Sequence, residues 1–128
     1  MISFFMLTNK TAIITGSNRG IGKAILEIFL KNNATVWACS RNYNENDYKD
    51  LINTYVNKIN FISFDLENIE EVKKSANIII KENDKIDILV NNAGIIHSSL
   101  FQMTNIDDMK NLFEINYFSQ LAFTQIII

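Results

Sequence analysis

All four glycines of the chain lie in two short motifs, a usage that indicates a site where the backbone approaches a ligand. Residues 15–22 read Thr-Gly-Ser-Asn-Arg-Gly-Ile-Gly and hold three of them, and the fourth closes the Asn-Asn-Ala-Gly motif of residues 91–94. Glycine is needed where the backbone adopts a positive φ or comes very close to a ligand. Backbone N–H groups at a helix start are unpaired and partly positive, so such a turn suits a diphosphate. We therefore predict that residues 15–22 bind a dinucleotide.

A nucleoside-triphosphate loop is the main rival for this motif, and its spelling is G-x-x-x-x-G-K-[ST]. Gly22 and Lys23 match the end of that pattern. Ser17 stands where the first glycine is required, and Ala24 replaces the hydroxyl that would hold Mg²⁺. We therefore reject a triphosphate loop, and we expect no metal site.

Apolar runs alternate with segments of helical periodicity, which indicates the elements that position these motifs. The predicted strands cover residues 11–15, 35–39, 61–64 and 86–90. The predicted helices, in which apolar residues recur every three or four positions, cover residues 20–31, 47–55, 69–81 and 107–124. Alternation of buried-type strands with helices predicts an α/β fold whose parallel sheet is covered on both faces. We expect the doubly wound nucleotide-binding arrangement, with strand order 3-2-1-4.

The motifs together resemble those of the short-chain dehydrogenase/reductase family, in its ordinary-length branch. The turn at 15–22 has the spacing T-G-x-x-x-G-x-G rather than the commoner G-x-G-x-x-G, and residues 65–66, 87–94 and Asn116 add three further matches. Within this family, the sequence most resembles the 3-oxoacyl-carrier-protein reductases. The resemblance implies that residues 1–128 form an incomplete NAD(P)-binding Rossmann-type domain. The chain would be the N-terminal half of such an enzyme, truncated after the fourth strand and the helix that follows it.

The resemblance also implies which residues contact the cofactor. They come from the glycine-rich turn, from the ends of the second and third strands, and from the Asn-Ala-Gly motif. They are Gly16, Ser17, Asn18, Arg19, Gly20, Ile21, Gly22, Arg41, Asp65, Leu66, Asn92, Ala93 and Gly94.

Two loops are expected to hold the adenosine. By the resemblance, Asp65 bonds the adenine amino group while the Leu66 backbone lines the ring, and residues 92–94 border the ribose. Asp65 could equally cap the helix that follows it, and both roles can hold together. We expect Asn91 and Asp87 to be structural, with Asn91 bonding backbone between strands.

The end of the second strand favours NADP(H) over NAD(H), although NAD(H) stays open. An acid there would hydrogen-bond the ribose 2′-hydroxyl of NAD, whereas a basic residue accommodates the 2′-phosphate of NADP. Ser40 occupies the acid position and Arg41 follows it, while Arg19 adds a second guanidinium beside the turn. The planar fork of arginine suits phosphate because it donates two hydrogen bonds at once. Arg41 can also be read as a solvated loop residue, since residues 42–50 are polar.

The family reduces small-molecule carbonyls or oxidises alcohols with an Asn, a Ser and a Tyr-x-x-x-Lys pair. Asn116 matches the Asn, whose implied role is to hold a water in a proton relay to the Lys; Tyr is the acid/base and Ser orients the substrate. None of the four tyrosines has a lysine four positions on: the residues found there are Asp47, Ile52, Ile59 and Leu121. We therefore expect these 128 residues alone to be inactive.

His97, Ser98 and Ser99 follow the Asn-Ala-Gly motif and invite comparison with a Ser-His catalytic site. The sequence places no acid to orient His97, so we interpret the three as loop residues on the substrate side.

The net charge and composition of the chain argue against several kinds of binding partner and indicate its cellular location. The formal net charge of −2 gives no electrostatic case for nucleic acid or an anionic membrane. Apolar residues 2–7 are too short to span a membrane and lack the flanks of a signal peptide. The one cysteine, Cys39, falls in a predicted buried strand, which indicates a core thiol in a reducing, cytoplasmic compartment.

Three hypotheses of function follow. The first is an NADPH-dependent oxidoreductase present as a truncated chain, and the resemblance implies that its full-length relatives are homo-oligomers through the helix containing Asn116. The second is a non-catalytic dinucleotide-binding module or partner subunit, and the third is a non-functional remnant. Because the fourth strand would be an open edge and the long helix would lack partners, we expect the isolated chain to be poorly soluble or partly unfolded.

Overall fold

The computed structural model describes residues 6–128, so most of the apolar segment 2–7 lies outside the described residues. The strands are β1 (Thr11–Thr15), β2 (Thr35–Ser40), β3 (Ile59–Ser63) and β4 (Ile88–Val90). The α-helices are α1 (Gly20–Lys31), α2 (Lys49–Thr54), α3 (Ile69–Glu82), α4 (Ile106–Phe113) and α5 (Ser119–Ile127). Two 3-10 turns, η1 (Glu45–Asp47) and η2 (Phe101–Met103), and a π-helical turn, η3 (Glu114–Phe118), complete the described elements.

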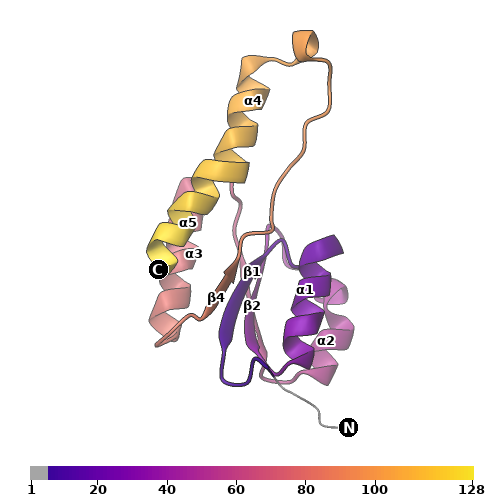
Figure 1. The fold of residues 1–128 in the computed structure, drawn as a ribbon, viewed down its shortest axis with the longest axis vertical. Helices are drawn as coiled ribbons and strands as arrows, with labels where there is room; N and C mark the ends of the chain where they lie inside the picture. The colour runs from indigo at the N-terminus through magenta and orange to yellow at the C-terminus, as the bar shows by residue number, and fades with distance from the viewer. Residues whose placement is uncertain (1–5) are drawn as a thin grey trace.

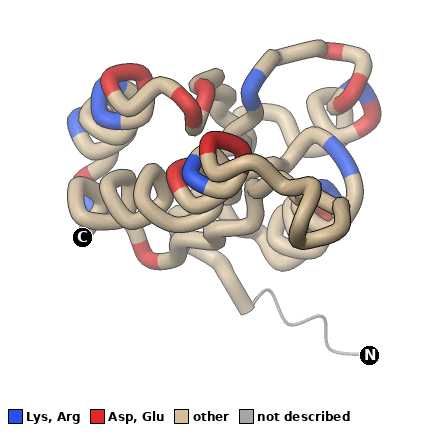
Figure 2. The backbone as a smooth tube through the Cα atoms, turned by 90° about the horizontal axis from the view of Figure 1, so that it is seen from above, with Lys and Arg blue, Asp and Glu red and all other residues tan. Residues whose placement is uncertain are grey.

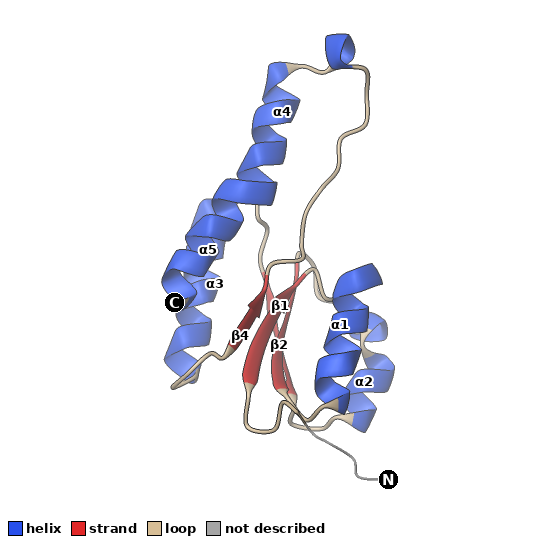
Figure 3. Ribbon diagram, in the orientation of Figure 1, coloured by secondary structure: helices blue, strands red, loops and turns tan. Residues whose placement is uncertain are grey.

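The strands form one parallel sheet in the order β3-β2-β1-β4, which confirms the predicted fold class and strand order. Helices α1 and α2 cover one face of the sheet and α3 and α5 cover the other (Figure 1, Figure 3). All pairings are parallel, so the carboxyl ends of the four strands meet at one edge. The turns that follow the strands therefore gather there, where doubly wound sheets bind their ligands.

Alternating residues of the strands build two separate cores. Ala12 and Ile14 of β1 are fully buried on the side of α1, where they meet Leu26 and Leu30. Ile13 is buried on the opposite side with α3 and α5. Because both faces of β1 and β2 are covered, these strands have nearly continuous apolar sequences rather than alternating ones.

Several predicted boundaries differ from the structure, and backbone hydrogen bonds account for the differences in β3, α2 and β4. β3 begins at Ile59 rather than at 61, since Asn57 takes a φ of 64° and Val36 N then donates to Lys58 O at 2.8 Å. α2 covers Lys49–Thr54 rather than 47–55, because Glu45–Asp47 forms a separate 3-10 turn. β4 is confined to Ile88–Val90, the three residues that pair in register with β1.

The predicted helix 107–124 is not α-helical throughout, because a π-helical turn interrupts it. Ser119 N donates to Glu114 O, five residues earlier, so the turn between α4 and α5 is π-helical. Such a turn holds more residues than an α turn and rotates the helix face that follows it, and it is often found at functional sites. α4 extends beyond the sheet, whereas α5 runs beside α3 (Figure 1).

Charged residues of both signs lie near one another on the helices and loops (Figure 2), in keeping with the net charge of −2. Among residues 6–128, no helix is long and apolar enough to cross a membrane.

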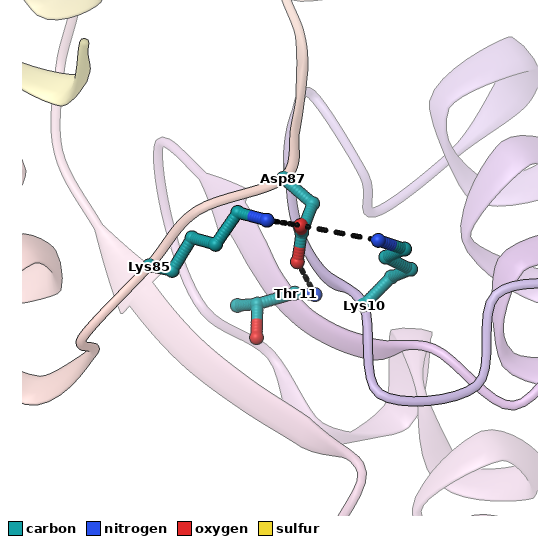
Figure 4. Close-up of polar contacts among 4 residues, drawn as sticks. All are labelled: Lys10, Thr11, Lys85 and Asp87. Carbon is teal, nitrogen blue, oxygen red and sulfur yellow. Dashed lines mark hydrogen bonds and ion pairs between the residues drawn. The ribbon is translucent and has the colours of Figure 1, made fainter.

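Asp87 ties the start of β4 to the start of β1, in agreement with its predicted structural role (Figure 4). Its Oδ2 accepts a hydrogen bond from Thr11 N at 2.9 Å, and its own N–H donates to Thr11 O at 2.9 Å. Its Oδ1 lies 2.9 Å from Lys85 Nζ and 3.6 Å from Lys10 Nζ. The Thr11 N–H, helped by Lys85, lowers the pKa of Asp87 from 3.8 to about 2.

We expect Asp87→Asn to make the free energy of unfolding less dependent on pH in the acid range. The folded state favours the carboxylate, so the stabilisation is complete above pH 3.8 and is lost as the pH falls through about 2. Urea unfolding followed by the fluorescence of Trp37 measures this effect. As the pH falls from 3.8 to about 2, the urea concentration at the unfolding midpoint should decrease more for the parent chain than for the variant. The matched control is Asp84→Asn, an exposed carboxyl three residues earlier. An equal decline for Asp87→Asn and the parent chain would contradict the prediction.

Candidate functional site: a cleft at the carboxyl edge of the sheet

A cleft of about 600 Å³ opens at the carboxyl edge of the sheet and collects most of the predicted cofactor-binding residues. Its walls come from the turn after β1, the loop after β2, the turn after β3 and the segment after β4. Of the predicted residues, those that line it are Gly16, Asn18, Arg19, Gly20, Ile21, Arg41, Asp65, Leu66, Asn92, Ala93 and Gly94. Residues as far apart in the sequence as Gly16 and Gly94 thus line the same cleft.

The glycine-rich turn is packed so tightly that side chains are excluded at two positions. Gly16 has a φ of +65°, and a Cβ on it would lie 3.0 Å from both Ala93 Cα and Asn92 Nδ2. A Cβ on Gly22 would lie 2.0 Å from Gly16 O and 2.5 Å from Asn92 Nδ2. By contrast, nothing lies within 4 Å of a Cβ position on Gly20, where the turn faces open space. The glycines therefore fold the turn onto itself and leave its outer side open for a ligand.

The first turn of α1 faces the cleft and has the electrostatic character of an anion site. Arg19 is the N-cap residue, with extended backbone and no side-chain cap, and the first turn contains no acid. Its first N–H groups have no partner within the helix and carry partial positive charge. Residues 18–21 line the cleft, so these groups point where a diphosphate would lie.

Ser17 and Gly22 differ from the other predicted residues, because they support the turn from behind. Ser17 is fully buried, and both its N–H and its Oγ donate to Cys39 O at 3.1 Å. Gly22 is buried against Gly16. The sequence could not separate these residues from their neighbours, since the motif is continuous.

Asn92 follows β4 and stabilises the glycine-rich turn that follows β1. Its Nδ2 donates to Thr15 O at 3.1 Å and to Gly16 O at 3.2 Å. The Thr15 hydroxyl accepts from the N–H groups of Asn92 and Ala93, both at 3.0 Å. The predicted role of Asn91 in bonding backbone between strands is therefore wrong: Asn92 performs it, while Asn91 donates to Thr124 Oγ1 at 3.0 Å.

Asp65 lies in a turn that leaves part of its carboxylate available. Its Oδ1 accepts from Glu67 N at 2.9 Å, and its N–H donates to Glu71 Oε2 at 2.9 Å. The alternative role as a helix cap belongs instead to Asn68, whose Oδ1 accepts from the N–H groups of Glu70 and Glu71. A carboxylate accepts several hydrogen bonds, so Asp65 keeps capacity for a donor in the cleft.

Asn116 lies in the π-helical turn and holds the segment that follows the Asn-Ala-Gly motif. Its Oδ1 accepts from Ile95 N at 2.8 Å and its Nδ2 donates to Ile95 O at 2.7 Å. Its side chain lies close enough to Gly94 that a Cβ there would be 3.1 Å from Oδ1. Asn116 does not itself line the cleft, although its neighbour Ile115 does.

Two further positioning residues on the same helix were missed in the sequence. Ser119 is fully buried, and its Oγ donates to Leu66 O at 2.6 Å. Gln120 Nε2 donates to Ala93 O. One helix face therefore holds the backbone of the segments that follow β3 and β4. The available signal was that Ser119 and Gln120 stand three and four positions after Asn116.

The residues that invite a Ser-His reading are exposed in the loop before η2. His97 Nε2 lies 3.1 Å from Ser99 Oγ, and Ser99 Oγ contacts Thr104 Oγ1. Within residues 6–128 the structure gives His97 no carboxylate partner, and no group of His, Cys, Asp and Glu there could hold a metal ion.

Comparison with known proteins decides the family. The sequence model described as short chain dehydrogenase matches residues 10–128. The chain belongs to the short-chain dehydrogenase family. It is 36% identical over 111 residues to a 3-oxoacyl-[acyl-carrier-protein] reductase of Buchnera aphidicola, covering 85% of this chain and 44% of that protein. It is 34% identical over 116 residues to a 3alpha-hydroxysteroid dehydrogenase of Mediterraneibacter gnavus, covering 88% and 46%.

A solved structure shares the fold. The active-site complex of RhlG with NADP from Pseudomonas aeruginosa matches with a TM-score of 0.85 at 26% identity, covering 99% of this chain and 50% of that one. The predicted resemblance is thereby confirmed. The chain spans less than half the length of the two curated relatives named above.

Proposed function

We propose that the chain is the cofactor-binding half of an NADP(H)-dependent oxidoreductase acting on a small-molecule carbonyl or alcohol. The observation that carries the choice of cofactor is that Arg19 and Arg41, the only arginines among the 128 residues, both line the same cleft. No acid stands at the end of β2, where Ser40 precedes Arg41. Two guanidinium groups around one cleft favour a ligand with a phosphate beyond the diphosphate.

The residues that line the cleft have the chemistry that such a cofactor requires. In this proposal the unpaired N–H groups of residues 18–21 would bind the diphosphate, Arg41 would bind the 2′-phosphate, and Asp65 and Leu66 would border the adenine. Residues 92–94 would line the ribose, and Ser17 and Gly22 hold the turn in shape. When bound, the nicotinamide ring supplies or accepts the hydride. The reductase and the NADP complex among the similar proteins support this assignment.

Asn116 is proposed to contribute to the catalytic end of the site. Each atom of its carboxamide that bonds Ile95 keeps one further bonding position, because the oxygen has a second lone pair and the nitrogen a second hydrogen. Those positions can hold a water molecule, in line with the role that the family resemblance implies.

Dinucleotide binding without turnover is the second candidate for these 128 residues. The observation that favours it is that none of the four tyrosines is followed by a lysine four positions on. Tyr48 is also fully buried behind the turn, where no substrate reaches it.

The test of both candidates is titration of the chain with NADPH and NADH, followed by an assay with a carbonyl substrate. Calorimetry, or energy transfer from the sole tryptophan, Trp37, to the reduced nicotinamide, measures binding. Saturable NADPH binding that is tighter than NADH binding supports the assignment of the cleft. Turnover by these 128 residues excludes the second candidate, whereas binding without turnover is expected of the cofactor half alone as well as of a binding module. Equal affinity for the two nucleotides overturns the preference for NADP(H).

We also propose that the helix containing Asn116 pairs with a second copy. Its exposed apolar side chains include Phe113, Tyr117, Phe118 and Leu121, which are 43% to 56% exposed. Side chains of this size on one helix are typical of an interaction surface rather than of scattered surface residues.

We expect Phe118→Glu to shift the chain from dimer to monomer, because it places a charge in an apolar contact. Light scattering after size-exclusion chromatography measures the mass. The matched control is Ile28→Glu, which changes an equally exposed apolar residue on α1. A monomeric parent chain, or equal behaviour of the two variants, would contradict the proposed interface.

A further inference from the structure

Tyr48 is the largest fully buried side chain among the described residues, and it lies at the far end of the loop that follows β2. Its ring contacts Phe61, with centroids 4.8 Å apart, and Tyr43, with centroids 6.0 Å apart. Its hydroxyl lies 3.1 Å from Ser17 Oγ in the diphosphate turn. A buried tyrosine hydroxyl needs a hydrogen-bond partner, and here the partner belongs to the cofactor site.

The direction of this hydrogen bond follows from the hydrogens available. The single hydroxyl hydrogen of Ser17 is donated to Cys39 O at 3.1 Å. The Tyr48 hydroxyl is therefore the donor to Ser17 Oγ. Burial raises the pKa of Tyr48 above its ordinary value, so the hydroxyl keeps its proton at neutral pH. A chain of bonds thus runs from Tyr48 through Ser17 to Cys39.

This chain ties together the two parts of the cleft that recognise phosphate. Cys39 lies two positions before Arg41, and the exposed loop of residues 41–47 leads from Arg41 to Tyr48. Both ends of that loop are therefore fixed to Ser17, one through the Cys39 carbonyl and the other through the Tyr48 hydroxyl. Without the second attachment, the loop carrying Arg41 and the turn could move relative to each other.

We infer that Tyr48 is a positioning residue that holds the diphosphate turn in register with the loop carrying Arg41. Tyr48 lies behind the cleft wall and acts through Ser17. The consequence for NADPH rests on the function proposed above, whereas the effect on the turn does not.

The first measurement uses the nucleotide-free chain and its variants Tyr48→Phe and Tyr43→Phe. Tyr43 belongs to the same aromatic cluster, and within residues 6–128 the structure gives its hydroxyl no hydrogen bond. The Ser17 N–H donates to Cys39 O, so its hydrogen exchange reports on the turn. We expect Tyr48→Phe to speed this exchange about fivefold, the value of one ordinary hydrogen bond, and Tyr43→Phe to leave it unchanged.

The second measurement is the affinity of the same variants for NADPH and NADH. We expect Tyr48→Phe to raise the Kd of NADPH about fivefold and to lower the preference for NADPH over NADH, because Arg41 is no longer held in place. Should Tyr48→Phe unfold, Ser17→Ala removes the same bond from the other end together with the bond from Ser17 Oγ to Cys39 O, with exchange of the residue-17 amide as the readout.

The outcomes separate the two hypotheses. A parent chain that binds neither nucleotide overturns the proposed function, while the exchange rates still decide the role of Tyr48 in the turn. An unchanged exchange rate in Tyr48→Phe, or an unchanged NADPH affinity in a chain that binds NADPH, overturns the inference.

Discussion

Replacing Gly22 with alanine is expected to abolish saturable NADPH binding and to destabilise the fold. A Cβ at this position would lie 2.0 Å from Gly16 O and 2.8 Å from Gly16 C, which are backbone atoms with little freedom to move. It would also lie 2.5 Å from Asn92 Nδ2, which bonds the same carbonyl. Relief of these clashes requires α1 to move away from β1, and overpacking of this kind costs about 3 kcal/mol. The N–H groups of the turn then no longer converge on one position.

Gly20→Ala is the matched control within the same turn. Its Cβ would meet nothing within 4 Å, and the cost is confined to the positive φ of 57°, about 1 kcal/mol. Urea unfolding of the two variants should therefore rank Gly22→Ala well below Gly20→Ala in stability. If the two variants behave alike, the tight contact between Gly22 and Gly16 does not determine the shape of the site.

The sequence was sufficient for those parts of the fold that depend on local pattern. Residues 11–15 and 20–31 were predicted with the bounds that the structure has, because a continuous apolar strand, a glycine turn and a periodic helix are each specified locally. Strand order also followed from the sequence, since right-handed crossovers between parallel strands leave few arrangements.

The sequence was insufficient where a residue's role depends on a partner distant in the chain. Adjacent residues Asn91 and Asn92 have the same side chain, and only the packing against β1 shows that Asn92 bonds Thr15 and Gly16. The bond from Ser119 to Leu66 spans 53 positions, so the spacing of Ser119 from Asn116 marks the residue but does not indicate its partner. The π-helical turn at residues 114–118 could not be predicted either, because the apolar periodicity of the helix continues through it.

Replacing Arg41 with alanine is expected to remove most of the preference for NADPH over NADH. Arg41 lines the cleft and is exposed, so its bond to a 2′-phosphate would be charge-assisted but partly screened by water. Loss of such a bond corresponds to about a tenfold rise in the Kd of NADPH. The Kd of NADH should stay unchanged, because NADH has no phosphate at that position. Calorimetric titration of both nucleotides at low salt measures the two values.

Two further variants separate recognition by the guanidinium from a general effect of charge. Arg41→Lys keeps the charge and loses the planar fork, so it should recover only part of the NADPH affinity. Lys31→Ala removes one positive charge from the last turn of α1, at the opposite end of that helix from the cleft, and should leave the preference intact. If Lys31→Ala weakens NADPH binding as much as Arg41→Ala does, the attraction is long-range and Arg41 is only a solvated loop residue. If Arg41→Ala alone reduces the preference, Arg41 recognises the phosphate that distinguishes the two cofactors.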